Sequence, residues 1–189
     1  MILPVYLLGQ PVLREETEDI TPEYPELQKL IADMWDTMYN SDGVGLAAPQ
    51  IGRSISLIVI DGSVLAEDFP ECKDFKKVLI NPELEVIEDE APVSRPEGCL
   101  SLPGISENVK RYEHVRLKWL DENFQPHDEE FRGFASRIIQ HEFDHLLGEV
   151  FTDHISPIRK QMIRTKLNNI SRGKVNCGYR TSAANPHKR

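Results

Sequence analysis

The spacing of apolar residues predicts three helices and several strands along the chain. Helical spacing runs over residues 27–38 and 134–147, where Gly148 is placed to end the second helix. Ser156-Pro157 begins a third helix, which ends at Gly173. Continuous or alternating apolar positions predict strands at 54–60, 77–80 and 115–119. This order predicts an α+β fold with mostly antiparallel strands packed around a central helix, which the N-terminal and C-terminal helices accompany.

The composition is that of one ordinary globular domain. Of 189 residues, 40% are hydrophobic and 28% are charged. Residues 61–77 are polar and are expected to form a loop. We expect a single catalytic domain over 1–173 and a flexible basic tail over 174–189, where no apolar period is found. The chain shows no secretory leader and no apolar run near the ~20 residues of a membrane span. Three cysteines make a disulfide framework improbable and favour the reducing cytoplasm.

The segment His141-Glu142-Phe143-Asp144-His145 predicts a metal site on the second helix. Two histidines four residues apart lie on one helix face, so both imidazoles can bind one ion. The metal lowers the pKa of a bound water, and the adjacent Glu142 can take its proton. The pattern is H-E-x-x-H, which is typical of hydrolytic metal sites. Two core histidines hydrogen-bonded to the backbone are the structural alternative.

The third ligand has to come from outside this helix. In metzincin proteases a histidine occupies the position of Phe151, and a phenyl ring cannot bind metal. Upstream, Cys99 lies in a loop beside Gly98, and its thiolate suits zinc or iron(II). Cys99 could also be a small buried hydrophobe. A closed four-ligand zinc site is poorly supported, because neither Cys72 nor Cys177 belongs to a C-x-x-C pair.

The segment Gly43–Gly52 offers two features that suit peptide binding. Gly43 and Gly45 allow close backbone approach, so an extended peptide could pair with the main chain at Val44 and Gly45. The side-chain amide of Gln50 could stabilise an oxyanion. An ordinary glycine-containing loop is the alternative, and no phosphate-binding motif is present.

The chain resembles peptide deformylases in three blocks that occur in the family's order: GVGLAAPQIG at 43–52, EGCLS at 97–101 and QHEFDHLLG at 140–148. The resemblance implies a role for each matching residue. By motif, the metal ligands are Cys99, His141 and His145, the general base and acid is Glu142, the oxyanion donors are Gln50 and the Leu100 N–H, and the substrate backbone lies along Val44 and Gly45.

The implied reaction is hydrolysis of the formyl group from the N-terminal formyl-methionine of new polypeptides, with release of formate. Phe134, Ile138 and Val44 are candidates for the methionine pocket. The implied cofactor is one divalent ion, expected to be iron(II), although zinc, nickel or cobalt suits the same donors. The alternatives are another H-E-x-x-H amidase or metallopeptidase, and a non-enzymatic, metal-stabilised binding module.

Charge is distributed unevenly along the chain. All 31 acidic residues precede His154, whereas nine of the 22 basic residues follow Asp153. A basic end on an acidic body suggests a polyanionic partner. In the deformylase family a basic C-terminal helix is associated with the ribosome near the nascent-chain exit, so we expect the ribosome as a partner and expect neither DNA nor a membrane. A solvated helix face is the alternative.

Overall fold

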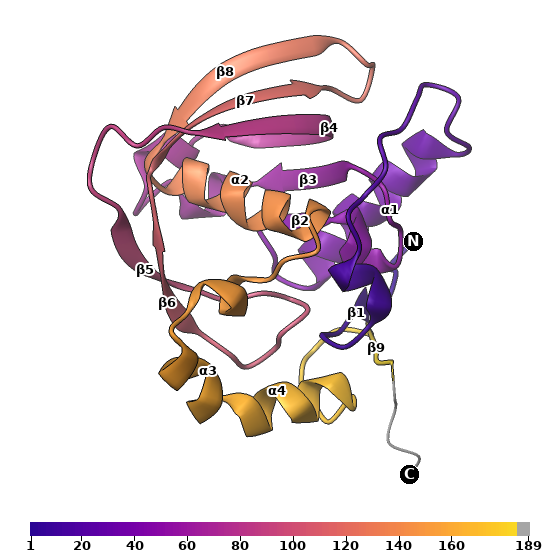
Figure 1. Ribbon diagram of the computed structural model, residues 1–189. Coiled ribbons are helices and arrows are strands. Elements are labelled where there is room, and N and C mark those ends of the chain that lie inside the picture. The colour runs from indigo at the N-terminus through magenta and orange to yellow at the C-terminus, as the bar shows by residue number, and fades with distance from the viewer. Residues whose placement is uncertain (185–189) are drawn as a thin grey trace.

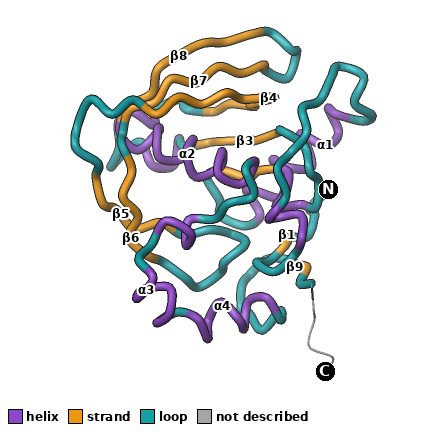
Figure 2. Tube along the Cα trace, viewed as in Figure 1, coloured by secondary structure: helices purple, strands orange, loops and turns teal. Residues whose placement is uncertain are grey.

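A five-stranded antiparallel sheet forms the centre of the computed structural model, which describes residues 1–184 (Figures 1 and 2). Its strand order is β2-β3-β4-β7-β8. The strands span Gly45–Ala47 (β2), Leu57–Asp61 (β3), Lys76–Val86 (β4), His114–Leu120 (β7) and Pro126–Arg132 (β8). Among the described residues, no helix is both long and apolar enough to cross a membrane.

Two helices cover opposite faces of this sheet, and β3 shows why. Successive side chains of a strand point to opposite faces. Leu57 and Val59 therefore pack in one core with α1 (Leu27–Asn40), whereas Ile58 and Ile60 pack in a second core with α2 (Gly133–Leu146). A strand covered on both faces reads as a continuous apolar run, as β3 does. The sheet thus places α2 on one of its faces, with α1 on the other.

A third core lies beside the sheet and brings a segment near the start of the chain together with segments of its C-terminal part (Figure 1). It joins β6 (Glu107–Arg111), which pairs with β5 (Val93–Glu97), to α4 (Arg164–Ser171), and α3 (Pro157–Met162) leads into α4 without a residue in this core. Nearby, β1 (Val5–Tyr6) pairs in parallel with β9 (Thr181–Ser182). Leu7, Leu102, Phe151 and Ile170 are all buried there, so this core connects segments from four parts of the chain.

A glycine stands at each end of α2, where the backbone adopts a conformation that favours this residue. Gly133 and Gly148 both have positive φ, the left-handed conformation that favours glycine. A Cβ on Gly148 would lie 2.7 Å from the backbone of Arg14. Beyond the helix end, the Glu149 N–H donates to the Asp144 carbonyl at 2.9 Å, which satisfies one of the last-turn carbonyls. The expected role of Gly148 as the C-terminal stop is confirmed.

The α+β architecture with mostly antiparallel strands is confirmed, but several elements differ from expectation. The sequence predicted α1, β3, β7 and α2, yet not β5, β6 or β8. The expected third helix is two helices, which meet at Ile163. The expected loop at 61–77 contains two short 3-10 turns, and β4 begins at Lys76.

The C-terminal segment also differs from the expected flexible tail. Residues 174–184 lie against the body of the protein, because Thr181 and Ser182 form β9 beside β1. Beyond the expected domain boundary at residue 173, the chain thus includes a short strand that pairs with β1. Residues 185–189, the remainder of the expected tail, lie outside the described residues.

Candidate active site

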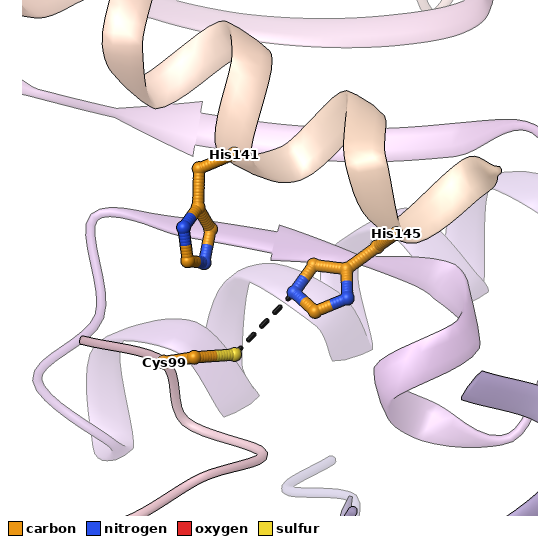
Figure 3. Close-up of side chains that lie close together, drawn as sticks. All are labelled: Cys99, His141 and His145. Carbon is orange, nitrogen blue, oxygen red and sulfur yellow. Dashed lines mark hydrogen bonds between the residues drawn. The ribbon is translucent and has the colours of Figure 1, made fainter. Parts of the chain in front are cut away.

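Cys99, His141 and His145 come together as the sequence predicts (Figure 3). Each offers a ligand atom, and these atoms all lie within 4.8 Å of one another. The two imidazoles descend from successive turns of α2, and their ring centroids are 5.4 Å apart. The Cys99 Sγ faces them from the β5–β6 loop, 3.4 Å from the Nε2 atom of His145. One sulfur and two nitrogens thus converge on one point.

The carboxylate of Glu97 orients the imidazole ring of His141. Its Oε2 atom lies 3.1 Å from the His141 Nδ1 atom, which leaves Nε2 of that ring for a ligand. Arg111 donates to both oxygens of Glu97, at 2.6 and 3.0 Å. Burial alone would raise the pKa of Glu97, but its hydrogen bonds to His141 and Arg111 outweigh burial and lower the pKa to about 2. A carboxylate behind a metal-binding imidazole fixes the ring's orientation and tautomer.

The two histidines differ in their preference for a proton. Burial lowers the pKa of His145, which favours the neutral ring. Burial would also lower the pKa of His141, but Cys99 and Glu97 raise it well above its ordinary value. Only neutral imidazole binds a metal, so an ion would displace the proton from His141.

Glu142 lies beside the cluster in a space that Gly45 leaves open. A Cβ on Gly45 would overlap the carboxylate of Glu142. Glu142 is buried, and its Oε2 atom has no hydrogen-bond partner among the described residues. Burial raises the pKa of this carboxyl to about 7 in the protein alone, whereas a cation nearby would favour the ionised form. The glycine expected to admit a substrate backbone thus also admits the candidate base.

A cavity of about 550 Å³ opens onto these groups. Most of the residues predicted for the site line it: Val44, Gly45, Gln50, Cys99, Leu100, Phe134, Ile138, His141 and Glu142. Gln50 accepts from the Ala47 N–H at 2.9 Å and turns its amide nitrogen toward Cys99 Sγ, at 3.4 Å, and Ser101 Oγ, at 3.2 Å. Its amide therefore points at the cluster.

Several residues of the site were missed from the sequence. Leu65, Arg137, Asn176, Cys177 and Tyr179 also line the cavity. Arg137 is fully buried and reaches the Val93 and Val109 carbonyls at 2.9 and 2.8 Å, which ties α2 to the hairpin. No spacing rule links these residues to the motifs. The three from the C-terminal segment come from the stretch that we expected to be a loose tail.

The donor set fits a divalent metal ion. Cysteine and histidine suit iron(II) and zinc, and three protein ligands leave a position for water or substrate, as in catalytic sites. A closed structural site would need a fourth protein ligand. The His145 nitrogen that faces the thiol is Nε2, 3.4 Å from the sulfur, and the buried Oε2 atom of Glu142 has no partner among the described residues. The arrangement can therefore hold one ion next to a buried carboxylate and an amide donor.

The fold and this donor set define a metal-dependent hydrolase of the H-E-x-x-H type. The family model described as polypeptide deformylase matches residues 2–161. A peptide deformylase of Christiangramia forsetii is 43% identical over 195 residues, which cover 100% of this chain and 99% of that protein. One from Flavobacterium johnsoniae is 44% identical over 191 residues, with 97% of each covered.

Solved structures agree with this assignment. The crystal structure of a peptide deformylase from Legionella pneumophila superposes with a TM-score of 0.78 at 37% identity and covers 92% of this chain and 98% of that one. A Plasmodium falciparum peptide deformylase in complex with an inhibitor gives a TM-score of 0.75 at 34% identity, covering 88% and 97%. The chain belongs to the polypeptide deformylase family.

Proposed function

We propose that this hydrolase removes the formyl group from the N-terminal formyl-methionine of newly made polypeptides and releases formate. The observation that carries the proposal is one wall of the cavity, where Cys99, His141 and His145 converge beside the buried Glu142. The ligands are these three residues. The ion is iron(II), since one thiolate and two imidazoles suit it, and zinc, nickel or cobalt can replace it. When bound, the ion supplies a Lewis acid and acidifies water.

The chain's own residues move the protons. Glu142 takes the proton of the attacking water and delivers it to the leaving amine nitrogen, and a cation bound nearby would keep its carboxyl ionised and able to accept that proton. Gln50 and the Leu100 N–H donate to the oxygen that becomes negative as the water adds to the formyl carbon. The Gln50 amide is already directed at the cluster by its bonds to Ala47 and Ser101.

The open edge of the sheet offers a place for the substrate backbone. β2 is an edge strand, and the Asp61 N–H donates to the Val44 carbonyl at 2.8 Å. In an antiparallel ladder this makes Gly45 and Ile60 a non-hydrogen-bonded pair, so the N–H and C=O of Gly45 point away from β3. A peptide can add there as a strand. Phe134, Ile138 and Val44 then receive the methionine side chain.

A panel of three peptides tests this function. Iron(II)-loaded protein, prepared without air, is given formyl-Met-Ala-Ser, acetyl-Met-Ala-Ser and free Met-Ala-Ser. We expect formate from the first peptide only, and no cleavage of the Met–Ala bond in any of them. Cleavage of an internal peptide bond, or acetate release at a rate close to that of formate, would favour a metallopeptidase or a general amidase instead.

The proposed partners follow from the same substrate. Nascent chains carry the formyl group as they leave the ribosome, so we propose that the enzyme works in the cytoplasm and docks near the nascent-chain exit through α3 and α4. In support, Arg164 and Lys166 are exposed on α4, and neither forms an ion pair within residues 1–184. Arg159 and Lys160 are less suited, because they pair with Glu107 and Asp153 of the body.

A further inference from the structure

The loop between β5 and β6 carries two residues of the site and has little regular structure of its own. It runs over residues 98–106, outside the ladder that joins Glu97 to Glu107. It supplies Cys99 and, one residue later, the Leu100 N–H. Within it, a turn forms where the Leu102 N–H donates to the Cys99 carbonyl at 2.9 Å. A loop that places a metal ligand and an oxyanion donor needs support from elsewhere.

Three separate parts of the chain supply that support. The Leu8 N–H donates to the Ser101 carbonyl at 3.0 Å, and Gln50 donates to the Ser101 hydroxyl at 3.2 Å. The Tyr179 hydroxyl donates to the Leu100 carbonyl at 2.8 Å. The bonds from Leu8 and Gln50 both restrain Ser101. Over the described residues, Tyr179 makes the only side-chain hydrogen bond to Leu100.

The chain directly after Tyr179 continues into β9, which lies beside β1 (Figure 1). The Val5 N–H donates to the Arg180 carbonyl at 2.9 Å, and the Leu7 N–H donates to the Ser182 carbonyl at 2.8 Å. Gln10 adds a side-chain bond to the Ser182 hydroxyl at 3.0 Å. The residues that follow Tyr179 in the chain thus fix its position relative to β1.

We propose that Tyr179 is a positioning residue for the reaction, because its hydroxyl fixes the Leu100–Ser101 peptide and with it the direction of the Leu100 N–H. The Leu100 N–H lies in the peptide whose carbonyl, that of Cys99, accepts from the Leu102 N–H, and the Leu100 carbonyl lies in the next peptide. With the Tyr179 bond both planar peptides are held, which restricts rotation at the Cα between them. Burial raises the pKa of Tyr179, which keeps the phenol protonated and donating. Tyr179 lies outside residues 2–161, which the family model matches.

The inference rests on the proposed function, since Leu100 donates to the oxyanion only if the enzyme hydrolyses an amide. Removing an oxyanion donor outright costs a factor of about 10² to 10³ in kcat. Loosening one costs less, and because the donor acts in the transition state the loss falls on kcat rather than KM.

Tyr179→Phe tests the proposal, since it removes the hydroxyl and keeps the ring. We expect kcat for formyl-Met-Ala-Ser to fall about tenfold, in line with partial loss of a donor, while KM and metal content stay as in the wild type. Hydrogen exchange of the Leu100 and Ser101 amides should be faster. Tyr24→Phe is the matched control, because Tyr24 packs against the first core, away from the cavity, and should change neither kcat nor exchange in the loop.

Three results would overturn the proposal. Wild-type kcat in Tyr179→Phe would show that the hydrogen bond does not position the donor. A raised KM with unchanged kcat would make Tyr179 a substrate contact, and loss of metal would make it a support for Cys99. An inactive, metal-loaded wild type would instead contradict the proposed function, and faster amide exchange in Tyr179→Phe would still support the positioning of the loop.

Discussion

Glu142 is the residue on which the proposed proton transfers depend. Its carboxyl is buried between Gly45 and the two histidines, and its pKa is raised to about 7. Glu142→Gln keeps the size and polarity of the side chain but removes the base. We therefore expect formate release to fall at least about a hundredfold, while the metal content of purified protein stays near one ion per chain. Turnover close to that of the wild type would rule out Glu142 as the base.

Gly45 should be as sensitive as the base itself. A Cβ there would displace the Glu142 carboxylate from its place beside the metal cluster and toward the cavity that it lines. We expect Gly45→Ala to lower kcat/KM by about a hundredfold, the cost of a displacement of about 1 Å in a catalytic group. Gly178→Ala is the control, since a Cβ there meets nothing within 4 Å. Equal activities of the two variants, measured by formate release, would contradict this account of Gly45.

At the scale of single residues, the motifs predicted the residues that meet in the site. They did not predict the residues that orient and support them. The four-residue spacing of His141 and His145 reports a helix face, and the resemblance supplied Cys99. Arg111 and Tyr179 act through contacts 14 and 79 residues away in the chain. Such contacts depend on tertiary packing, which no local pattern encodes.

The elements at the two ends of the chain are joined by a charged contact whose pH dependence can be measured. Arg14 donates to Asp153 at 2.5 Å, Lys160 pairs with it at 3.3 Å, and the Val150 N–H donates to it at 2.9 Å. Burial alone would raise the pKa of Asp153, but these bonds outweigh burial and lower it.

A carboxyl with a lowered folded-state pKa stabilises the fold above its unfolded pKa, about 3.9, and loses that contribution as the pH falls through the folded value. We expect Asp153→Asn to be less stable than the wild type at pH 7, and the difference in free energy of unfolding to narrow below about pH 4. Urea unfolding across pH measures it. Asp128→Asn removes an exposed partner of Arg116 and should cost little at any pH. A constant difference for Asp153→Asn would exclude this linkage.

The basic surface of α4 gives the second prediction for an element. Reversing Arg164 and Lys166 to Glu should weaken co-sedimentation with ribosomes and flatten its salt dependence, because fewer counterions are released on binding RNA. Reversing two exposed basic residues outside α4, Lys73 and Lys110, is the matched control, because neither forms an ion pair within residues 1–184. Formate release from a short peptide should stay unchanged in both variants. Unaltered co-sedimentation of the α4 variant at low salt would mean that this charge is only a solvated surface.

Elements whose apolar residues form a clear helical pattern or a continuous run were predictable, and those without such a pattern were not. α1 and β3 have regular burial patterns that their sequences reveal. β8 reads Pro-His-Asp-Glu-Glu-Phe-Arg and exposes most of its side chains, because it is the far edge of the sheet. Within residues 1–184, β5 and β6 pair only with each other. Their strand conformation follows from that pairing rather than from apolar alternation.

At the scale of the whole molecule, the site depends on segments that are far apart in sequence. α2 supplies two histidines and the proposed base, the β5–β6 loop supplies the thiol, and the chain after Gly173 lines part of the cavity. The sequence predicted the architecture and the central helix. It did not predict the last of these segments, because β9 has two residues and its strand partner is at the other end of the chain.

The central claim is that one metal ion, held by Cys99, His141 and His145, makes this chain a deformylase. Titration of metal-free protein with iron(II), without air, tests it most directly when formate release from formyl-Met-Ala-Ser is followed. We predict a rate that rises in proportion to added iron and levels off at one ion per chain, and no such plateau for Cys99→Ala. Full activity in protein shown to be metal-free, or in Cys99→Ala loaded with one ion, would contradict the account.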